Sequence, residues 1–540
     1  MTTVARIMAE TLKELGVQYV FGVPSGNWTD YMAAIQQTEG LEFILISNEG
    51  AAGFMADVCW RLTGQVAACF GTFGPGACNL TTGVCGGYLD RSPMLAFTDE
   101  MNDQMRSRVS QMNIDHQALF KPITKWTARL EPGKVKKTLY KAFQTATAEV
   151  PGPVHIGLPA GIAMLEVNEE TAIYQAPVEI NSADPAVLEK MSALFNQSRK
   201  PVIAVGIGAL RFDVQGLIVR ILEKFQIPVV LTPMAKGLVS EDHPSYAGVL
   251  AHALSDQVGL THQQADLVIG IGYDPIEINY EDWMPQVPLL HIDTRPADLD
   301  RDNLTLGLDV IGHLNPSLEH LLSLDCSKKE WNLEAVTDRK AAMFARFNSP
   351  RGTFGPRKVL EDLRAILPSD GIMTCDVGAH LHLIGQQWKT ISPDRQLMSN
   401  GCSSMGFAVP AALAAKLCRP DRKVCCVVGD GGFYMAAGEI ATAKRLGLAV
   451  VFVLLTDGQL SLIKIKQERK GYASYGTQLQ DFSDGFETYP TLFGVPVMVA
   501  RDADHYQLAL QQAFAENGPV IVEAIINGDE YDELILKGNN

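Results

Sequence analysis

Residues 424–433 read Val-Cys-Cys-Val-Val-Gly-Asp-Gly-Gly-Phe, and this stretch is the most informative about the fold. Its five leading apolar residues predict a short buried strand. Gly429, Gly431 and Gly432 let the backbone turn tightly around Asp430 and expose N–H groups where that strand ends. A buried strand that runs through such a turn into a helix is typical of a parallel α/β sheet.

The next predicted strand also ends in a carboxylate, within Leu-Leu-Thr-Asp-Gly-Gln at 454–459. One crossover helix, 436–447, and one strand, 449–455, separate Asp430 from Asp457. A right-handed connection then returns the chain to the same sheet edge, which makes Asp457 a second candidate ligand. Oxygen ligands beside free amides suit a hard cation with a phosphate. A tight turn with a solvated Asp430 is the alternative, because glycine-rich turns alone are weak motifs.

Short apolar strands alternate with segments of helical period along the rest of the chain. Predicted strands cover 19–23, 43–46, 66–70, 94–97 and 154–158, then 202–205, 229–231, 267–271 and 289–292, and finally 372–375, 396–399, 423–428, 449–455 and 520–526. Polar stretches at 166–184 and 326–351 are predicted linkers. The predicted fold class is therefore α/β, with three doubly wound parallel-sheet domains at 1–175, 185–330 and 350–540.

Composition excludes several classes of partner. The 540 residues include 45 Lys and Arg against 61 Asp and Glu, a formal net charge of −16, whereas nucleic acids and anionic membranes attract basic surfaces. The charge-free apolar runs are shorter than the ~20 residues that a bilayer span needs, and the N-terminal stretch lacks the apolar core of a signal peptide. The ten cysteines form no Cys-x-x-Cys pair. We therefore expect a cytoplasmic protein with buried free thiols.

Two segments near the N-terminus join a strand to a helix through small residues. Asn48-Glu49-Gly50-Ala51-Ala52-Gly53 places a carboxylate at a helix start, where another molecule can approach closely and Glu49 could hold or give a proton. The alternative is that Glu49 only complements the helix N-terminus. Gly71-Thr-Phe-Gly-Pro-Gly-Ala-Cys-Asn79, taken alone, is a generic anion-binding loop.

Together these segments resemble the thiamine-diphosphate (ThDP) enzymes, in the acetolactate-synthase-like branch that includes acetohydroxyacid synthases, benzoylformate decarboxylase and benzaldehyde lyase. Glu49 with its small neighbours resembles the family's Glu motif, and 72–80 resembles its Gly-Pro-Gly loop. Asp430 between its glycines, with Asp457, resembles the metal–diphosphate motif. The resemblance spans essentially the whole chain, and three ordered motifs are far more specific than any one of them.

The resemblance implies a homo-oligomer, either a dimer or a dimer of dimers, whose active sites lie between subunits. The N-terminal domain of one subunit would hold the aminopyrimidine of ThDP, and the C-terminal domain of another would hold its diphosphate through Mg²⁺. Glu49 would share a proton with the pyrimidine, which activates the thiazolium carbon for attack on a carbonyl. After loss of CO₂ from a 2-keto acid, the remaining fragment either leaves as an aldehyde or attacks a second carbonyl compound.

The family's cofactor contacts carry over residue by residue. The matched cofactor-binding residues are Gly74, Asn79, Val377, Ala379, His380, Ser403, Met405, Gly429, Gly431 and Gly432. The metal ligands would be the Asp430 carboxylate, the Asp457 side chain and the Gln459 carbonyl, although the family usually has Asn at the position of Asp457. Met405 matches the apolar side chain that props the bent cofactor. Plain core packing for Met405 and a structural role for His380 are the alternatives.

The substrate pocket is the part that the sequence describes least. Gln111 matches a glutamine that faces the reacting carbon in acetolactate synthases, so it joins Glu49 as a candidate catalytic residue. The candidate pocket residues are Asn27, Trp28, Phe73, His116, Leu460 and Ile463. Phe73 replaces a smaller serine of the family and predicts a tighter pocket on that side. Asn27 or Trp28 could lie over the thiazolium, and an exposed loop position is the alternative for Trp28.

We expect a ThDP- and Mg²⁺-dependent carboligase that decarboxylates pyruvate or a similar 2-keto acid and joins the fragment to a second carbonyl compound. The alternatives are a non-oxidative decarboxylase or C–C lyase that releases an aldehyde, and a non-catalytic scaffold that keeps the fold. Some relatives bind FAD in the middle domain. Segments 271–277 and 119–125 look especially like catabolic acetolactate synthases, and Tyr273-Asp-Pro-Ile-Glu277 is closer to relatives without flavin, so we expect no FAD.

Overall fold

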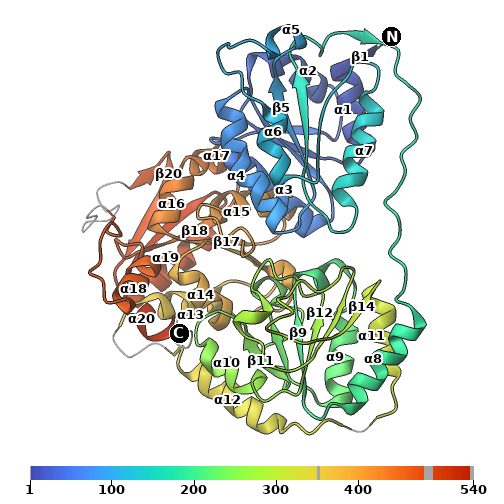
Figure 1. Cartoon of the computed structure of the whole chain (residues 1–540). Helices are drawn as coiled ribbons and strands as arrows, with labels where there is room; N and C mark the ends of the chain where they lie inside the picture. Colours follow the sequence, from blue (N-terminus) through green and yellow to red (C-terminus); the bar gives the residue numbers. More distant parts are fainter. Residues whose placement is uncertain (1, 327, 349–352, 480–489, 536–540) are drawn as a thin grey trace.

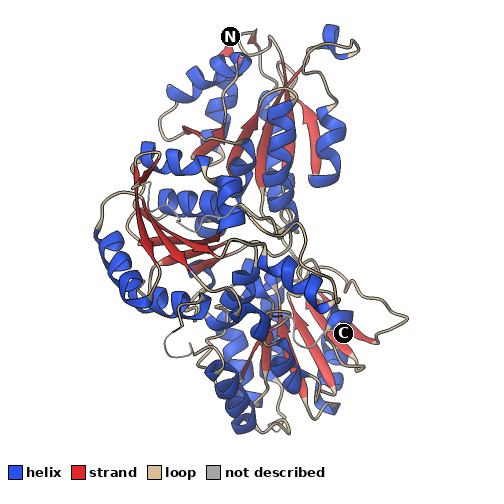
Figure 2. Ribbon diagram, turned by 90° about the vertical axis from the view of Figure 1, so that its left-hand side faces the viewer, coloured by secondary structure: helices blue, strands red, loops and turns tan. Residues whose placement is uncertain are grey.

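Three α/β units make up the molecule, as the computed structural model shows for residues 2–326, 328–348, 353–479 and 490–535. Each unit is built on one sheet of mainly parallel strands with helices on its faces (Figures 1 and 2). The predicted fold class is therefore confirmed. Among the described residues, no helix is long and apolar enough to cross a membrane.

The N-terminal unit is a wholly parallel sheet in the order β3-β2-β4-β5-β7-β6. Its strands are β2 (Tyr19–Gly22), β3 (Glu42–Leu45), β4 (Ala67–Gly71), β5 (Met94–Glu100), β6 (Trp126–Arg129) and β7 (Val154–Pro159). Its helices are α1 (Val4–Glu14), α2 (Thr29–Gln36), α3 (Glu49–Thr63), α4 (Pro75–Leu89), α5 (Asp103–Arg106), α6 (His116–Phe120) and α7 (Val135–Thr147). The central strands read as continuous apolar runs because helices cover both faces of the sheet.

A long extended connection leads from the N-terminal unit to the middle unit (Figure 1). It begins at β8 (Glu166–Val167), which pairs with β1 (Thr2–Thr3) in an antiparallel ladder, and it carries no further helix or strand before residue 185. Segment 166–184 thus has the irregular structure that its polar composition predicts.

The middle unit is a wholly parallel sheet in the order β11-β10-β9-β12-β13-β14. Its strands are β9 (Pro201–Val205), β10 (Val229–Leu231), β11 (Tyr246–Val249), β12 (Leu267–Ile271), β13 (Leu289–Asp293) and β14 (Leu306–Ile311). Its helices are α8 (Pro185–Gln197), α9 (Gln215–Phe225), α10 (Ser255–His262), α11 (Leu314–Ser323) and α12 (Leu333–Ala345). The strand order reverses between β9 and β12, the usual place for a crevice in such sheets.

The C-terminal unit has the order β16-β15-β17-β18-β21-β20-β19, parallel except for the last pair. Its strands are β15 (Ile372–Cys375), β16 (Gln396–Leu397), β17 (Val424–Gly429), β18 (Val450–Thr456), β19 (Thr491–Leu492), β20 (Val495–Ala500) and β21 (Val520–Ile525). Its helices are α13 (Pro356–Ile366), α14 (Ala379–Gln387), α15 (Ala408–Cys418), α16 (Asp430–Ala436), α17 (Gly438–Leu446), α18 (Ser461–Arg469), α19 (Ala503–Ala515) and α20 (Glu530–Leu534). The quoted stretch 424–433 forms β17 and the start of α16.

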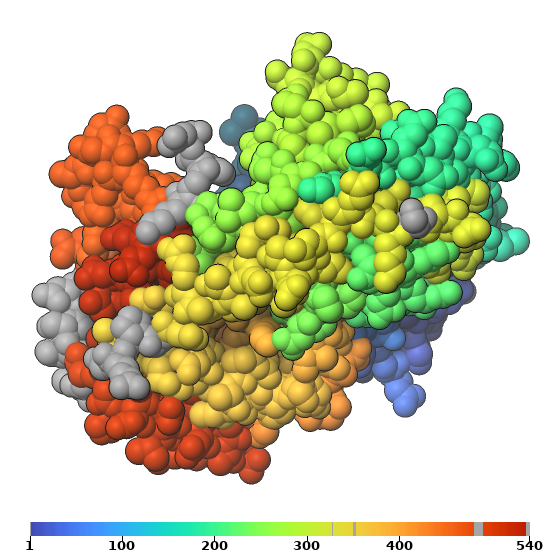
Figure 3. All heavy atoms as spheres, turned by 90° about the horizontal axis from the view of Figure 1, so that it is seen from below, coloured from blue at the N-terminus to red at the C-terminus, as the bar shows by residue number. Residues whose placement is uncertain are grey.

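Three expectations about the elements were wrong. The predicted linker 326–351 contains α12, whose buried Val336 and Met343 anchor an otherwise polar helix against the middle unit. The yellow part of the chain, which includes α12, lies between the green middle unit and the orange C-terminal unit (Figure 3). The single predicted crossover helix 436–447 is two helices, α16 and α17, and the predicted strand 396–399 is only β16.

The cysteines are also less buried than predicted. All ten are free, but only five are buried, whereas Cys78 is exposed and the other four are half-buried. The expectation of free thiols is met, and the expectation that they are all buried is wrong because several lie at helix ends and in loops between units rather than in strands.

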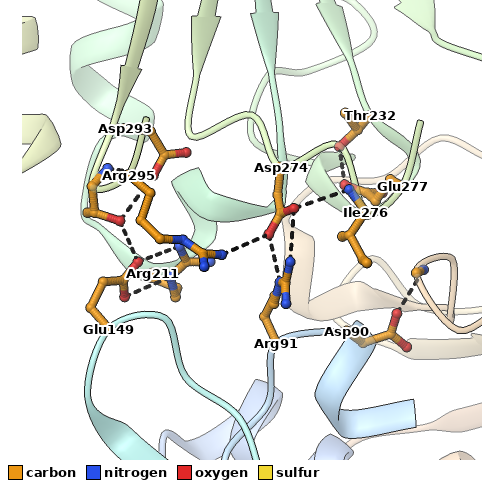
Figure 4. Close-up of polar contacts among 12 residues, drawn as sticks. Asp90, Arg91, Glu149, Arg211, Thr232, Asp274, Ile276, Glu277, Asp293 and Arg295 are labelled. Atoms are coloured by element: carbon orange, nitrogen blue, oxygen red, sulfur yellow. Dashed lines mark hydrogen bonds and ion pairs between the residues drawn. The ribbon is translucent and has the colours of Figure 1, made fainter. Parts of the chain in front are cut away.

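Ion pairs hold the middle unit against the N-terminal unit (Figure 4). Arg91 donates two hydrogen bonds to Asp274, at 2.7 and 3.1 Å, and Arg211 donates two to Glu149, at 3.1 and 2.6 Å. Close by, Glu277 accepts hydrogen bonds from the Thr232 hydroxyl at 2.6 Å and the Met234 N–H at 2.8 Å. Burial, together with the charges of nearby aspartates, raises the pKa of Glu277 to about 7.

The raised pKa of Glu277 predicts a pH-dependent stability. An acid whose pKa rises from 4.5 to about 7 on folding stabilises the fold fully below pH 4.5, and this contribution is lost as the pH rises through about 7. Glu277→Gln keeps a hydrogen-bonding side chain without the charge. We expect its thermal midpoint to fall less than that of the wild type between pH 5 and pH 8, measured by circular dichroism. Glu319→Gln, at an exposed carboxylate on α11, should leave the pH dependence of the thermal midpoint unchanged. If the thermal midpoints of Glu277→Gln and the wild type fell equally between pH 5 and pH 8, the prediction would be contradicted.

Candidate active site

Glu49 is the first residue of α3 and is buried there, with 7% of its surface exposed. Asn48 caps the helix, because its side-chain oxygen accepts the Gly50 N–H at 2.9 Å. The Asn79 amide donates to Oε2 of Glu49 at 3.0 Å, and a Cβ placed on Gly76 would lie 3.0 Å from Oε1. The glycine therefore keeps space beside the carboxylate, and the Asn79 hydrogen bond brings the two N-terminal motifs together.

The Gly-Pro-Gly loop is supported from behind by a buried histidine. Gly74 has a φ of +56°, and its N–H donates to Nε2 of His116 at 3.4 Å. The other ring nitrogen of His116 lies 2.9 Å from the Thr98 hydroxyl. Burial lowers the pKa of His116 to about 4, so the ring is neutral and can accept this hydrogen bond. His116 thus holds the loop and is itself covered, since only 2% of it is exposed.

The loop after β2 does not present Trp28 to a pocket. Trp28 is fully buried, with its ring 3.9 Å from that of Phe70 and 5.0 Å from that of Tyr31. A 3₁₀ turn at Gly26–Trp28 directs the indole into the core of the N-terminal unit. Both interpretations of Trp28, as a pocket residue and as an exposed loop residue, are therefore wrong.

Asn27 points to a buried carboxylate that the sequence analysis missed. Its amide donates to Asp99 at 2.9 Å, and the hydroxyls of Ser25 and Thr72 donate to the same carboxylate at 2.6 and 3.2 Å. Asp99 therefore joins the loop after β2 to the Gly-Pro-Gly loop. Burial raises the pKa of Asp99. Asp99 lies two residues beyond the predicted strand 94–97, and no sequence motif marked it for this role.

Gln111 and Phe73 lie on the outer side of this half of the site. Gln111 is exposed, in the loop between α5 and α6, and Phe73 is half-buried. The backbone of the next residue, Met112, approaches the Gly74 turn, where a Cβ on Gly74 would lie 3.3 Å from the Met112 Cα. The structure thus places the Gln111 loop against the Gly-Pro-Gly loop, but brings Gln111 into no hydrogen bond with Glu49.

Asp430 and Asp457 meet at the carboxyl ends of neighbouring strands β17 and β18. Asp430 begins α16, and its carboxylate accepts the N–H of Gly458 at 2.8 Å. Burial, followed by the charge of Asp457, raises the pKa of Asp430 to about 7. Oδ1 of Asp457 accepts the Gln459 N–H at 3.1 Å, and Oδ2 accepts the Ser461 hydroxyl. The crossover argument thus brings these two carboxylates together as predicted.

A small cavity of about 140 Å³ opens beside Asp457 and Gln459. Burial raises the pKa of Asp457. In the part of the chain that the structure describes, no group of three or more His, Cys, Asp or Glu side chains gathers in a metal-binding arrangement. Two carboxylates and a backbone carbonyl are nevertheless a donor set that suits Mg²⁺, which keeps part of its shell for water and phosphate oxygens.

The segment before α14 is built around Asp376. Its carboxylate accepts the N–H groups of Gly406 at 3.0 Å, Phe407 at 2.9 Å and Ala408 at 3.3 Å. A Cβ on Gly432 would lie 1.7 Å from Oδ2 of Asp376, so only glycine fits there. Asp376 thus joins the loop at Val377 to the Met405 loop and to the turn after Asp430. No sequence motif assigned this role to Asp376, because the N–H groups that it accepts lie 30 to 32 residues further along the chain.

His380 and Met405 both face the glycine turn of α16. Nε2 of His380 is buried and has no hydrogen-bond partner in the described structure, and its ring lies against Gly378 and Gly429. Burial lowers the pKa of His380 to about 4. A Cβ on Gly431 would lie 3.1 Å from the Met405 methyl and 2.7 Å from Leu460. An orphaned ring nitrogen beside glycine amides fits an anion that the protein itself does not supply.

The remaining predicted residues lie near this turn but make other contacts. Val377 is half-buried before α14, which begins at Ala379. The Ser403 hydroxyl is exposed and donates to the Asn400 carbonyl at 2.7 Å. Ile463 is exposed on α18.

One carboxylate of the C-terminal unit reaches the segment before Glu49. Glu439 of α17 accepts the N–H groups of Ser47 at 2.9 Å and Asn48 at 3.1 Å. Its partners are almost 400 residues away, so no local pattern could have revealed this contact.

The three units and their motifs define a thiamine-diphosphate enzyme. Residues 2–119, 188–321 and 376–524 match the models of the N-terminal TPP binding domain, the central domain and the C-terminal TPP binding domain of thiamine pyrophosphate enzymes. Similar proteins include a probable acetolactate synthase large subunit of Methanocaldococcus jannaschii, 29% identical over 99% of this chain and 93% of the relative. An acetolactate synthase of Bacillus subtilis is 28% identical over 97% and 93% of the two chains.

The chain therefore belongs to the ThDP-dependent enzymes, in the acetolactate-synthase-like branch. It is an enzyme of the ThDP-dependent carboligase family, as the resemblance implied.

Because Asp376 accepts three backbone N–H groups, replacing one of its carboxylate oxygens should strongly lower the free energy of unfolding. Asp376→Asn replaces one acceptor oxygen by an NH₂ group that opposes a backbone N–H, so a buried donor is left unsatisfied. We expect the free energy of unfolding in urea to fall by about 2 kcal/mol. The exposed Asp370→Asn serves as the control. If both variants unfold at the same urea concentration as the wild type, Asp376 does not hold these loops.

Proposed function

We propose that this enzyme decarboxylates pyruvate or a similar small 2-keto acid and joins the resulting fragment to a second carbonyl compound, with ThDP and Mg²⁺ as cofactors. The observation that carries the proposal is the buried Glu49 carboxylate, held by Asn79 and flanked by Gly76 at the mouth of the Gly-Pro-Gly loop. The acetolactate synthases among the similar proteins support the choice of substrates.

Glu49 would hold and move a proton at Oε1, while Asn79 occupies Oε2. ThDP, when bound, supplies a thiazolium carbon that adds to a carbonyl and stabilises the charge left by loss of CO₂. Met405 and Leu460, which pack beside Gly431, would support the cofactor on the side of the C-terminal unit. Gln111 would contact the substrate from the exposed loop.

The diphosphate and the cation would be held by the C-terminal unit. Asp430, Asp457 and the Gln459 carbonyl would bind Mg²⁺. Nε2 of His380 and the N–H groups of Val377, Ala379, Gly429 and Gly432 would face the diphosphate, beside the Gly431 N–H, which donates to Oδ1 of Asp430 at 2.8 Å. Asp457 in place of the family's Asn adds one negative charge, and Ser461 and the Gln459 N–H offset it through hydrogen bonds.

We further propose that the middle unit works without FAD and that the enzyme acts in the cytoplasm. The loops after β9 and β12 pack directly on each other, since a Cβ on Gly206 would lie 2.6 Å from the Tyr273 Cα. The charged groups around this crevice pair with one another, as Arg91 does with Asp274. Ten free cysteines suit a reducing compartment.

A second candidate reaction is release of the fragment as an aldehyde, in a non-oxidative decarboxylase or lyase. Phe73 favours it, because a half-buried aromatic ring in place of a small residue leaves less room for an acceptor. Incubation with pyruvate, ThDP and Mg²⁺ separates the two, since acetolactate supports the carboligase and acetaldehyde alone supports the decarboxylase. Absence of ThDP binding in calorimetry would contradict both reactions.

Glu49→Gln is the sharpest test of the mechanism. We expect the variant to fold, because glutamine can still accept the Asn79 hydrogen bond, but to lose at least about 100-fold in kcat for product formation. Glu42→Gln, at an exposed carboxylate on β3, should keep wild-type turnover. If Glu49→Gln turned over as fast as the wild type, proton transfer by Glu49 would be unnecessary and the proposal would fail.

We also propose that two copies of the chain form each active site. Both halves expose apolar side chains: Val109, Met112 and Ile114 stand beside Gln111 in the sequence of one half, and Tyr434, Met435, Ile463 and Tyr472 belong to α16, α18 and the segment after α18 in the other. A second copy that places the N-terminal unit of one chain on the C-terminal unit of the other would cover both patches.

Mixed dimers test this arrangement. Glu49→Gln and Asp430→Asn should each be inactive as homodimers. When the two variants are co-expressed with different tags, the mixed dimer has one site with both wild-type halves, so a random mixture should regain about a quarter of wild-type activity. No activity in purified mixed dimers would show that each chain builds its own site. Size-exclusion chromatography confirms that each variant still assembles.

A further inference from the structure

Two cysteines face each other where the N-terminal unit packs on the C-terminal unit. Cys59 lies on α3, and Cys418 is the last residue of α15, a helix that packs along α3. Their sulfur atoms lie 3.4 Å apart, although 359 positions separate them in the sequence. Neither residue belongs to the proposed active site.

The surrounding contacts fix both thiols in this position. Arg419 donates to the Leu62 carbonyl, and Arg61 donates to the Met398 carbonyl at 2.9 Å, so two hydrogen bonds hold the end of α3 just after Cys59 to the C-terminal unit. Phe54 of α3 packs edge-on against Phe407 with ring centres 5.5 Å apart. The sulfurs therefore stay close in the folded protein, and a bond of about 2.05 Å requires them to approach by only about 1.4 Å.

We propose that Cys59 and Cys418 are an oxidation site, at which hydrogen peroxide converts the two thiols into a disulfide that joins the N-terminal and C-terminal units covalently. The Cys418 thiolate attacks one peroxide oxygen, which gives a sulfenic acid and hydroxide. The Cys59 thiol then attacks the sulfenic sulfur and releases water, while the hydroxide takes up the proton that Cys418 lost. Two thiols are oxidised by two electrons, and one peroxide is reduced to two waters.

The two thiols differ in exposure and in pKa, as these two reaction steps require. Cys418 is half-buried, so peroxide can reach it, whereas only 3% of Cys59 is exposed. The contact with Cys59 and the charge of Arg419 lower the pKa of Cys418, which favours its thiolate. The contact with Cys418, together with burial, raises the pKa of Cys59. Cys418 is thus the attacking sulfur and Cys59 the one that closes the bond.

The disulfide would close a loop that spans most of the chain and all of the middle unit. Such a cross-link restricts the conformations of the unfolded chain. It also keeps the N-terminal and C-terminal units from separating. It would also fasten α3, the helix that begins with Glu49. In the reduced protein, the contacts named above that hold this junction are packing and hydrogen bonds.

Peroxide treatment followed by peptide analysis tests the proposal directly. The reduced, full-length protein is exposed to hydrogen peroxide, quenched with N-ethylmaleimide and digested without reductant for mass spectrometry. We expect a disulfide-linked peptide pair that contains Cys59 and Cys418, removed by dithiothreitol. The oxidised protein should also melt several degrees higher than the reduced protein.

Matched variants separate this pair from other cysteines. Cys418→Ser, at a half-buried position, should abolish both the cross-link and the shift in melting temperature. Cys78→Ser, at an exposed cysteine, and Cys85→Ser, whose thiol hydrogen-bonds Cys402 across the same junction, should keep both. Recovery of Cys59 and Cys418 as alkylated or over-oxidised residues after peroxide would overturn the proposal, as would cross-linking of Cys85 to Cys402 alone.

Discussion

Gly53 of α3 and Gly83 of α4 approach so closely that a Cβ on Gly53 would lie 2.3 Å from the carbonyl carbon of Gly83. The two helices therefore touch along their backbones, and any larger side chain would push them apart. Glu49 begins the first helix and Asn79 is the fifth residue of the second, so their 3.0 Å hydrogen bond depends on this contact. The position of the candidate proton-transfer group is thus set by the absence of side chains about 6 Å further along the same helix.

In the C-terminal unit, a glycine likewise permits a close approach, here of the Asp376 carboxylate to the backbone. The carboxylate fits against Gly432 and collects three backbone N–H groups from the Met405 loop, so the strand ends at Asp376 and Asp430 and the Met405 loop form one rigid cluster. Glu439 then binds the backbone at Ser47 and Asn48, directly before Glu49. Buried carboxylates with backbone donors, rather than ion pairs, therefore join the elements that carry the site.

The sequence predicted what depends on local pattern. Central strands such as β17 and β18 are apolar throughout, so their ends, and the meeting of Asp430 with Asp457, followed from topology. Helix α12 was missed because two buried residues anchor an otherwise polar segment. Trp28 was misplaced because a 3₁₀ turn, which no periodicity reveals, rotates it into the core. Asp99, Asp376 and Glu439 were missed because their partners are distant in the sequence, and only the tertiary fold brings them together.

A chain of net charge −16 that binds an anionic diphosphate needs attraction that does not come from bulk charge. In the described structure, this attraction can come from backbone N–H groups where strands of the C-terminal sheet end. β15 and β17 are parallel neighbours, so α14, which begins at Ala379, and the glycine turn at 429–432 direct backbone N–H groups to the same place. His380, neutral and with Nε2 unpaired there, adds a hydrogen-bonding group without adding charge. Amide dipoles act at short range, so the acidic surface and an anion site can coexist in one molecule. The two aspartates beside the turn would, with the proposed Mg²⁺, bring the anion in together with a cation.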